Sequence, residues 1–152
     1  MDIEIKKNLL NSSLERTAEK LGDITPNVME RFYARFQDAR QCFEELYRGD
    51  RQKLEGEMIE QVLYCLMEWY DCPGEIEIVM VTTIPHHVEC LHVHPEFFSG
   101  LIDAACDTLV STIPAEEAAE LGVWTELQET MRSLVDDNVR YICNDKSYAQ
   151  TS

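Results

Sequence analysis

The four histidines of this chain lie within nine consecutive residues, at His86, His87, His92 and His94. Neutral imidazole is the commonest metal ligand in proteins, and a single proximal histidine holds the iron of oxygen-binding haem proteins. One interpretation is therefore that one of these histidines ligates a metal or haem iron. In a second, His86 and Cys90, four residues apart and so on one helical face, bind a bare ion such as zinc together with His92 or His94. In a third, they are surface histidines near a helix end, where a cation meets the carbonyl dipole.

Few other residues are spaced for chemistry. Because a disulfide framework or a zinc site needs closer spacing than these cysteines have, we expect reduced and mostly buried thiols. The six cysteines are Cys42, Cys65, Cys72, Cys90, Cys106 and Cys143. The sequence has no glycine-rich phosphate loop, Gly-x-Ser-x-Gly elbow, His-Glu-x-x-His motif or EF-hand loop. Acidic residues four apart are expected to form solvated faces and not catalytic carboxylate pairs.

The composition indicates one globular domain. A length of 152 residues fits a single domain, and 45% hydrophobic residues suffice for a core, which excludes disordered and collagen-like classes. The formal net charge of −16 repels phosphate backbones and anionic lipid, so we expect no nucleic acid and no membrane as partners. No apolar run approaches the ~20 residues that span a bilayer, and charges interrupt the N-terminus where a signal peptide has an apolar core. We therefore expect a cytoplasmic location.

The apolar periodicity predicts six or more helices joined by short corners. Residues 3–21 form an amphipathic helical pattern. Thr25 and Pro26 predict the start of a second helix, with a hydroxyl at the N-cap and proline in the first turn. Residues 39–47 predict a short helix, and apolar positions at steps of three and four predict a long one over 51–70.

One segment argues against an all-helical chain. Residues 75–84, EIEIVMVTTI, alternate at first and are rich in β-branched side chains, so local propensity favours a strand. A strand needs a partner, because unpaired backbone groups are costly, and the rest of the chain offers no second convincing strand. We therefore expect a helix or irregular coil at 75–84.

The C-terminal third predicts two further helices. Pro95 opens the first, and Ala115 begins a last long helix that ends near Cys143. The polar tail over 144–152 is expected to be frayed. The predicted fold class is all-α, with a single domain over residues 1–152.

Two stretches in the first half resemble the globin family, in particular single-domain bacterial globins. FYARFQDARQCFEELY resembles the second globin helix and the corner after it, which implies that Tyr33 lies on the distal side of a haem and that Tyr47 lies at the corner. Globins nearly always have phenylalanine at that corner, so Tyr47 is a departure. RQKLEGEMIEQVLYCLMEW resembles the distal helix. Leu54 takes a position where many globins keep histidine or glutamine, and Met58, one turn on, would cover the haem face.

A third stretch, HHVECLHVHPEFF, resembles the proximal segment of globins, in which a histidine is followed by a short loop and then by Pro-Glu-x-aromatic. Spacing to Pro95 implies His86 or His87 as the iron ligand, and we choose His86. Pro85 immediately before it is another departure, which fits if the proximal helix begins there with proline in its first turn.

The resemblance extends from Ile24 to Val139 and implies a globin-like three-over-three arrangement of six to eight helices that binds haem b. It implies reversible binding of a diatomic gas, namely oxygen, nitric oxide or carbon monoxide, for gas binding, sensing or detoxification. Tyr33 would donate a hydrogen bond to the gas in a dry pocket, or Met58 would bind the iron through sulfur. The residues implied to contact haem or its ligand are His86, Tyr33, Phe36, Phe43, Tyr47, Leu54, Met58, Leu91, Val93 and Phe98.

We expect a gas-binding protein more than a dedicated enzyme, with peroxidase or nitric oxide dioxygenase chemistry as side activities. The partners are then haem, a diatomic gas, a second copy of the chain in a homodimer and an external reductase. Two alternative functions stay open. A haem-free interaction module would fill its pocket with side chains such as Tyr47, Met58 and Trp69 and would act through its acidic surface. A helical metal-binding protein would use the histidine cluster.

Overall fold

The computed structural model describes the backbone of residues 1–151 and the side chains of residues 1–142. This part of the chain has seven α-helices, one π-helical turn and no strand, which confirms the predicted all-α class. None of the helices in it combines the length and the apolar character that crossing a bilayer requires. The elements are α1 (Ile3–Leu21), α2 (Thr25–Arg35), α3 (Ala39–Leu46), α4 (Arg51–Glu68), α5 (Pro73–Pro85), the π turn η1 (His86–Cys90), α6 (Glu96–Val110) and α7 (Ala118–Thr151).

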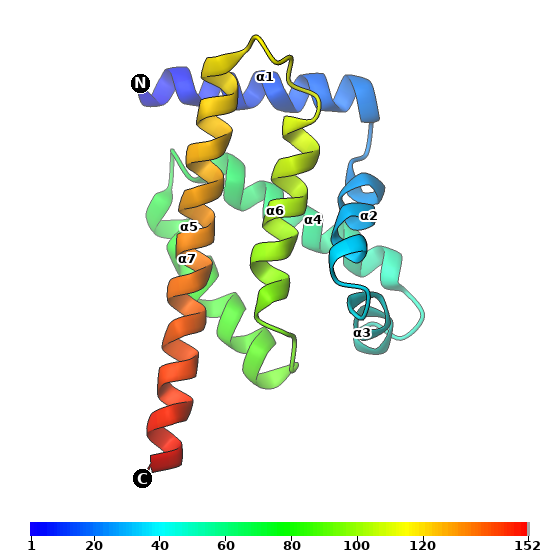
Figure 1. The fold of residues 1–152 in the computed structure, drawn as a ribbon, viewed down its shortest axis with the longest axis vertical. Helices are drawn as coiled ribbons and strands as arrows, with labels where there is room; N and C mark the ends of the chain where they lie inside the picture. The colour runs from blue at the N-terminus through cyan, green and yellow to red at the C-terminus, as the bar shows by residue number, and fades with distance from the viewer. Residues whose placement is uncertain (152) are drawn as a thin grey trace.

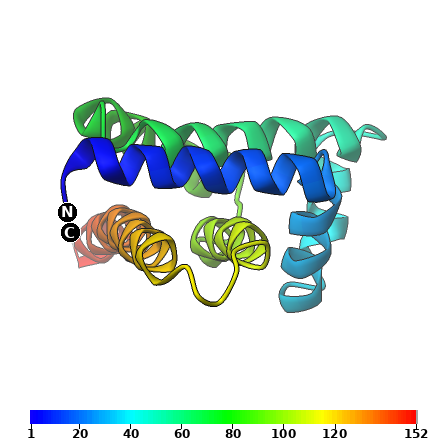
Figure 2. The same ribbon diagram turned by 90° about the horizontal axis from the view of Figure 1, so that it is seen from above.

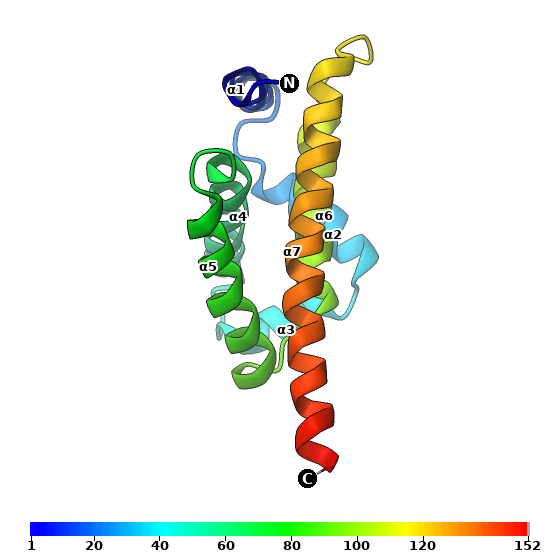
Figure 3. The same ribbon diagram turned by 90° about the vertical axis from the view of Figure 1, so that its left-hand side faces the viewer.

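The helices form two facing layers. Figure 3 shows α4 and α5 on one side and α6 and α7 on the other. Helix α1 crosses α6 and α7 near one end of the molecule and runs roughly along α4 (Figures 1 and 2). Helices α2 and α3 close a third side (Figure 1). The principal packing partners are α6 with α7 and α2, and α7 with α5 and α1, so α6 and α7 form the centre of the domain.

Helix α5 contains the segment whose local composition favours a strand. Pro73 occupies its first turn, and Ile76, Met80 and Ile84, four residues apart, are all buried. In a strand Ile78 and Thr82 would share the face of this stripe, but both are exposed here, so the observed burial follows the period of a helix. Packing against α4 and α7 therefore outweighs β-propensity, and the expectation of a helix here is confirmed.

Helix α5 ends at Pro85, whereas the resemblance to the globin proximal segment fits only a helix that begins there. Proline has no N–H to donate to the preceding turn and its ring crowds the carbonyl four residues back. The next five residues form the wider π turn η1, and His92 beyond it adopts a left-handed conformation with φ of 56°. His86 and His87 therefore lie in a π turn at the end of a helix.

Helix α7 begins at Ala118, later than the predicted Ala115, and its backbone continues to Thr151. It therefore extends through most of the tail, 144–152, that the sequence predicts as frayed. The side chain of Cys143 and residue 152 lie outside the described residues. Of the other cysteines, all free thiols, two are buried, two are half-buried and one is exposed: Cys65 and Cys106, Cys42 and Cys72, and Cys90.

A buried polar cluster fixes α1 to the start of α7. The Ser13 hydroxyl donates to Glu120 Oε1 at 2.5 Å and accepts a hydrogen bond from Trp124 Nε1 at 2.8 Å. Arg16 donates to both carboxylate oxygens of Glu120, which is only 2% exposed. A buried carboxylate is tolerated here because it is both paired with a cation and hydrogen-bonded.

Candidate functional site

A cavity with a volume of about 590 Å³ lies between α4 and α5. Helix α3 and the corner after it contribute one wall, α6 contributes the floor, and Val135 of α7 closes the far end. Most of the lining side chains are aliphatic, aromatic or sulfur-containing. A cavity of this size with an apolar wall and few polar groups is typical of a site for a cofactor or other small molecule.

His87 is the only histidine that lines this cavity. Its Nδ1 lies 2.8 Å from the carbonyl oxygen of Thr83, one helical turn earlier. Because a carbonyl oxygen only accepts hydrogen bonds, Nδ1 must carry the proton and donate. In the neutral imidazole this leaves the lone pair on Nε2, which makes no hydrogen bond within the described part of the chain.

The ring of His87 is also fixed by packing. Its edge meets the Phe98 ring of α6, with centroids 5.7 Å apart and planes at 89°. The backbone behind it is tied as well, since the His87 carbonyl accepts a hydrogen bond from the N–H of Val93 at 3.0 Å. A backbone carbonyl that holds one imidazole nitrogen is the usual way in which a protein orients the other nitrogen toward a metal.

His86, our choice for the iron ligand, does not line the cavity. It is exposed, and its ring stands 5.7 Å from that of His87 at 89°. Consecutive residues of a helical turn point in different directions, and of these two only His87 lines the cavity. The geometry therefore favours His87, which the sequence placed second.

Seven of the other nine side chains that the resemblance implies as haem contacts do line the cavity. These are Phe43, Tyr47, Leu54, Met58, Leu91, Val93 and Phe98. They come from α3, α4, α6 and the loop after η1, which are far apart in sequence. The structure thus brings together the distal and proximal segments that the resemblance pairs.

Two implied contacts, Phe36 and Tyr33, lie outside the cavity. Phe36 packs beneath it, with its ring 5.3 Å from that of Phe97, which does line it. Tyr33 contacts Phe43 at a centroid distance of 6.2 Å, and its hydroxyl is buried without a hydrogen-bond partner in the described structure. Burial and the nearby charge of Glu55 raise the pKa of Tyr33, so the phenol stays protonated.

The α4 wall of the cavity offers little hydrogen bonding. Leu54, Met58 and Val62 present hydrocarbon and thioether surface, and burial raises the pKa of the Cys65 thiol to about 11. The amide of Gln61, at the exposed edge of the same helix, is the strong donor on this wall. A polar molecule in the cavity would therefore find few partners on α4.

Several lining residues were not assigned to the site from the sequence. On α5 and α6 these include Val79, Met80, Ile84, Phe97 and Leu101. Their helical periodicity was visible as an apolar face, but periodicity does not show which part of a face stays uncovered by other side chains. Val62 and Cys65 continue the three-and-four spacing of Leu54 and Met58 and could have been included.

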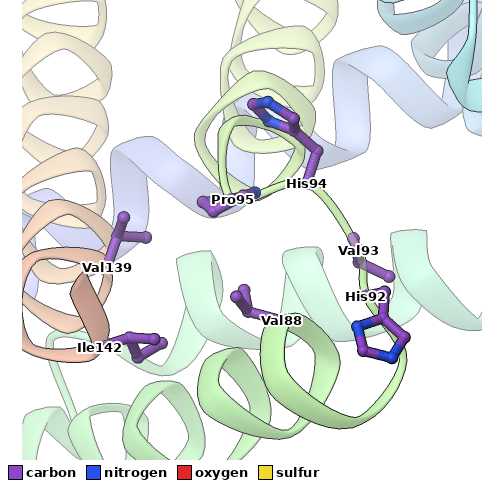
Figure 4. A pocket seen from close by; sticks show the side chains of 7 residues that line it. All are labelled: Val88, His92, Val93, His94, Pro95, Val139 and Ile142. Atoms are coloured by element: carbon purple, nitrogen blue, oxygen red, sulfur yellow. The ribbon is translucent and has the colours of Figure 1, made fainter. Parts of the chain in front are cut away.

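A second, smaller cavity of about 320 Å³ lies on the other side of Val93, which lines both (Figure 4). Val88, Val139 and Ile142 form its apolar walls, and His92 and His94 stand at its edge. The Nδ1 atom of His94 accepts a hydrogen bond from the N–H of Glu96 at 3.2 Å, so this histidine caps the first residue of α6.

The histidine cluster does not form a metal centre of the zinc type. Within the residues that the structure describes, no three His, Cys, Asp or Glu side chains come close enough together to hold a metal ion. His86, His92 and His94 are exposed at separate places around η1 and the following loop.

The chain matches no family model, no curated protein and no solved structure. Its function is therefore argued from the cavity and from His87.

Proposed function

We propose that this chain is a globin-like haem protein, with haem between α4 and α5 and His87 as its axial ligand. In this proposal the helices form the globin three-over-three arrangement, with α1, α4 and α5 as one layer and α2, α6 and α7 as the other. The views in Figures 2 and 3 support this grouping, because α1 lies on the side of α4 and α5.

One observation carries the proposal: a single imidazole lines an open apolar cavity, and its Nδ1 proton is fixed by a backbone carbonyl. His87 would hold the iron through Nε2, and Phe98 would keep the ring from rotating. Ferrous haem in this position would supply an iron atom that binds a diatomic gas reversibly. Met58, Leu54 and Phe43 would keep water away from that gas.

The position of Tyr33 and the apolar α4 wall bear on which gas would be held. Tyr33, expected to donate a hydrogen bond, has its hydroxyl outside the cavity. Bound oxygen gains most from a donor, because it carries partial negative charge, whereas carbon monoxide and nitric oxide gain less. We therefore place carbon monoxide or nitric oxide binding, or sensing, ahead of oxygen storage.

The haem-free alternative predicts a cavity filled by side chains. Tyr47 and Met58 instead stand in the wall of an open cavity, and Trp69 is not among the lining residues. The metal-binding alternative lacks a ligand cluster in the described residues. Both observations favour haem over the alternatives.

The test is a hemin titration followed by absorption spectroscopy, with His87→Gly and His86→Gly as a matched pair. We expect a stoichiometric Soret band in the unmodified protein and in the His86→Gly variant. We expect a lost or strongly altered band in the His87→Gly variant, restored when free imidazole occupies the space that the side chain leaves. A protein that gains no stoichiometric band from hemin contradicts haem binding. Loss of the band in the His86→Gly variant alone contradicts the choice of His87.

Reduction and exposure to carbon monoxide complete the experiment. A further shift of the band is expected if the α4 side of the iron is open or holds a displaceable ligand. No shift would leave haem binding in place and contradict gas binding.

A further inference from the structure

Four polar residues line the larger cavity along its α4 and α5 sides. Glu57 and Gln61 lie one turn apart on α4, and Thr82 and Thr83 lie on α5. Glu57, Gln61 and Thr82 are exposed, and the other exposed lining residues, Leu46 and Leu91, offer only hydrocarbon. Haem carries two propionate groups, and a carboxylate is costly to bury without a partner, so we expect the propionates at the exposed polar part of the lining.

The charge on this part of the lining has the wrong sign for propionates. Among the side chains that the structure describes, no lysine or arginine lines the cavity, and Glu57 is the one lining residue with a formal charge. Arg51, near the start of the same helix, is already paired with Glu44 at 2.9 Å and with Glu55 at 2.8 Å.

One lysine of α4 without an ion pair in the described structure lies near the cavity but does not line it. Lys53 lies one turn before Glu57 on α4, and its ammonium group is 5.9 Å from the ring centroid of Tyr47. Tyr47 lines the cavity and Lys53 does not. A propionate at the exposed polar part of the lining therefore meets the Glu57 carboxylate without a cation among the described lining residues to offset it.

We propose that Glu57 repels the propionates and makes haem in this cavity exchangeable, so that the chain takes up and releases haem instead of keeping it permanently. The inference rests on the proposed function and adds regulation of the same site: occupancy follows the supply of haem. Two like charges several ångströms apart at a solvated edge change an equilibrium by about three- to tenfold. This effect is large enough to decide whether a weakly held group stays bound.

The experiment measures the rate at which hemin transfers from the protein to an excess of a high-affinity apoprotein acceptor. The variants are Glu57→Gln and Glu57→Lys, with Glu60→Gln as the control, because Glu60 is an exposed acid on α4 that does not line the cavity. We expect hemin loss to slow about three- to tenfold in Glu57→Gln, to slow further in Glu57→Lys, and to be unchanged in Glu60→Gln. Circular dichroism checks that the exposed substitutions leave the helices intact.

Two further arms isolate the electrostatic cause. Added salt should slow hemin loss from the unmodified protein, because it screens repulsion, and should affect the Glu57→Gln variant less. Hemin dimethyl ester, whose propionates carry no charge, should leave the unmodified protein and Glu57→Gln at the same rate.

The outcomes separate the two proposals. Equal rates for hemin in the unmodified protein and Glu57→Gln, or faster loss from the variant, overturn the role of Glu57 and leave haem binding untouched. Hemin that binds stoichiometrically to neither the unmodified protein nor Glu57→Lys overturns the proposed function, and this inference with it.

Discussion

Leu54 is the residue at which the α4 wall could most simply be given a hydrogen-bond donor. It lines the cavity one turn before Met58, and its replacement by glutamine keeps a similar reach while adding an amide. In the hemin-loaded, reduced protein we expect Leu54→Gln to slow oxygen release by about tenfold and carbon monoxide release by less than about twofold. Gas release after rapid mixing measures both rates.

The apolar substitution Leu54→Met serves as the control for this prediction, since it changes shape without adding a donor. Its oxygen and carbon monoxide rates should change together. Equal slowing of both gases in Leu54→Gln would show that access to the cavity, and not hydrogen bonding, was changed.

Gly100 of α6 allows the ring of Phe36 to pack directly against the backbone of this helix. A Cβ at this position would overlap the ring of Phe36, which itself packs on Phe97. We expect Gly100→Ala to lower the free energy of unfolding by about 1–3 kcal/mol, because an overpacked core must shift side chains or backbone. Urea denaturation measures the change.

Gly122 in α7 is the matched control for Gly100, because a Cβ there meets no atom within 4 Å. Gly122→Ala should raise the free energy of unfolding by about 0.5–1 kcal/mol through the lower conformational entropy of the unfolded chain. Similar effects of the two alanines would mean that Phe36 yields easily and that the contact with Gly100 is not restrictive.

At the residue scale, the sequence predicted that a histidine of this cluster would line the site but not which one. Spacing to Pro95 does not decide between His86 and His87, and the apolar face of Ile84, Val88 and Leu91 favoured His86, a choice that fits only a helix beginning at Pro85. Proline is allowed both in the first turn of a helix and as its end, and only the packing of α5 decides between these. The π turn that follows has no sequence signature of its own, so which of the two imidazoles lines the cavity could not be predicted.

At the scale of elements, helix α5 is a case in which the sequence was ambiguous and the prediction nevertheless agreed with the structure. Its residues 75–84 favour a strand locally, yet the absence of a second strand in the sequence was enough to predict a helix or irregular coil there, and the segment is a helix. The order of elements was therefore predictable from periodicity. The helix ends were less predictable: α5 ends at Pro85 and α7 begins at Ala118, and apolar periodicity does not fix such boundaries.

The contact of α1 with α7 gives a prediction about pH. Burial raises the pKa of the Glu120 carboxyl, but hydrogen bonds from Arg16 and Ser13 lower it more, and the pKa is below its ordinary value. A group with a depressed folded pKa contributes stability above its unfolded pKa and loses it as pH falls through the folded value. The free energy of unfolding should therefore decrease on acidification below about pH 4.3, the ordinary glutamate pKa.

Glu120→Gln isolates this contribution. We expect it to be less stable than the unmodified protein by about 1–2 kcal/mol at neutral pH, and the difference to shrink as pH falls below the ordinary glutamate pKa. Urea denaturation at a series of pH values gives the comparison. Glu116→Gln, at an exposed acid in the loop before α7, should show no such convergence. A difference for Glu120→Gln that stays constant with pH would assign its effect to packing and not to charge.

At the scale of the whole molecule, the acidic excess is mostly uncompensated. Ion pairs in the described part involve seven acidic side chains, whereas the chain has 29 aspartates and glutamates. Surface ion pairs contribute little individually, and repulsion among the remaining acids opposes the compact state. The negative potential of these uncompensated acids would also act on the propionates of a bound haem. The effect of the net charge and the proposed role of Glu57 therefore have the same cause, repulsion between negative charges.

This balance predicts that salt stabilises the fold. Raising sodium chloride from about 0.01 M to about 0.5 M shortens the screening length several-fold and should raise the free energy of unfolding by about 1–2 kcal/mol. Urea must be the denaturant, because guanidinium chloride is itself a salt. The double variant Glu15→Lys and Glu19→Lys, at exposed acids of α1 without ion-pair partners in the described structure, makes the net charge less negative and should respond less to salt. Stability that falls with salt would instead mean that the attraction in pairs such as Arg132 with Asp103 outweighs the repulsion of the whole surface.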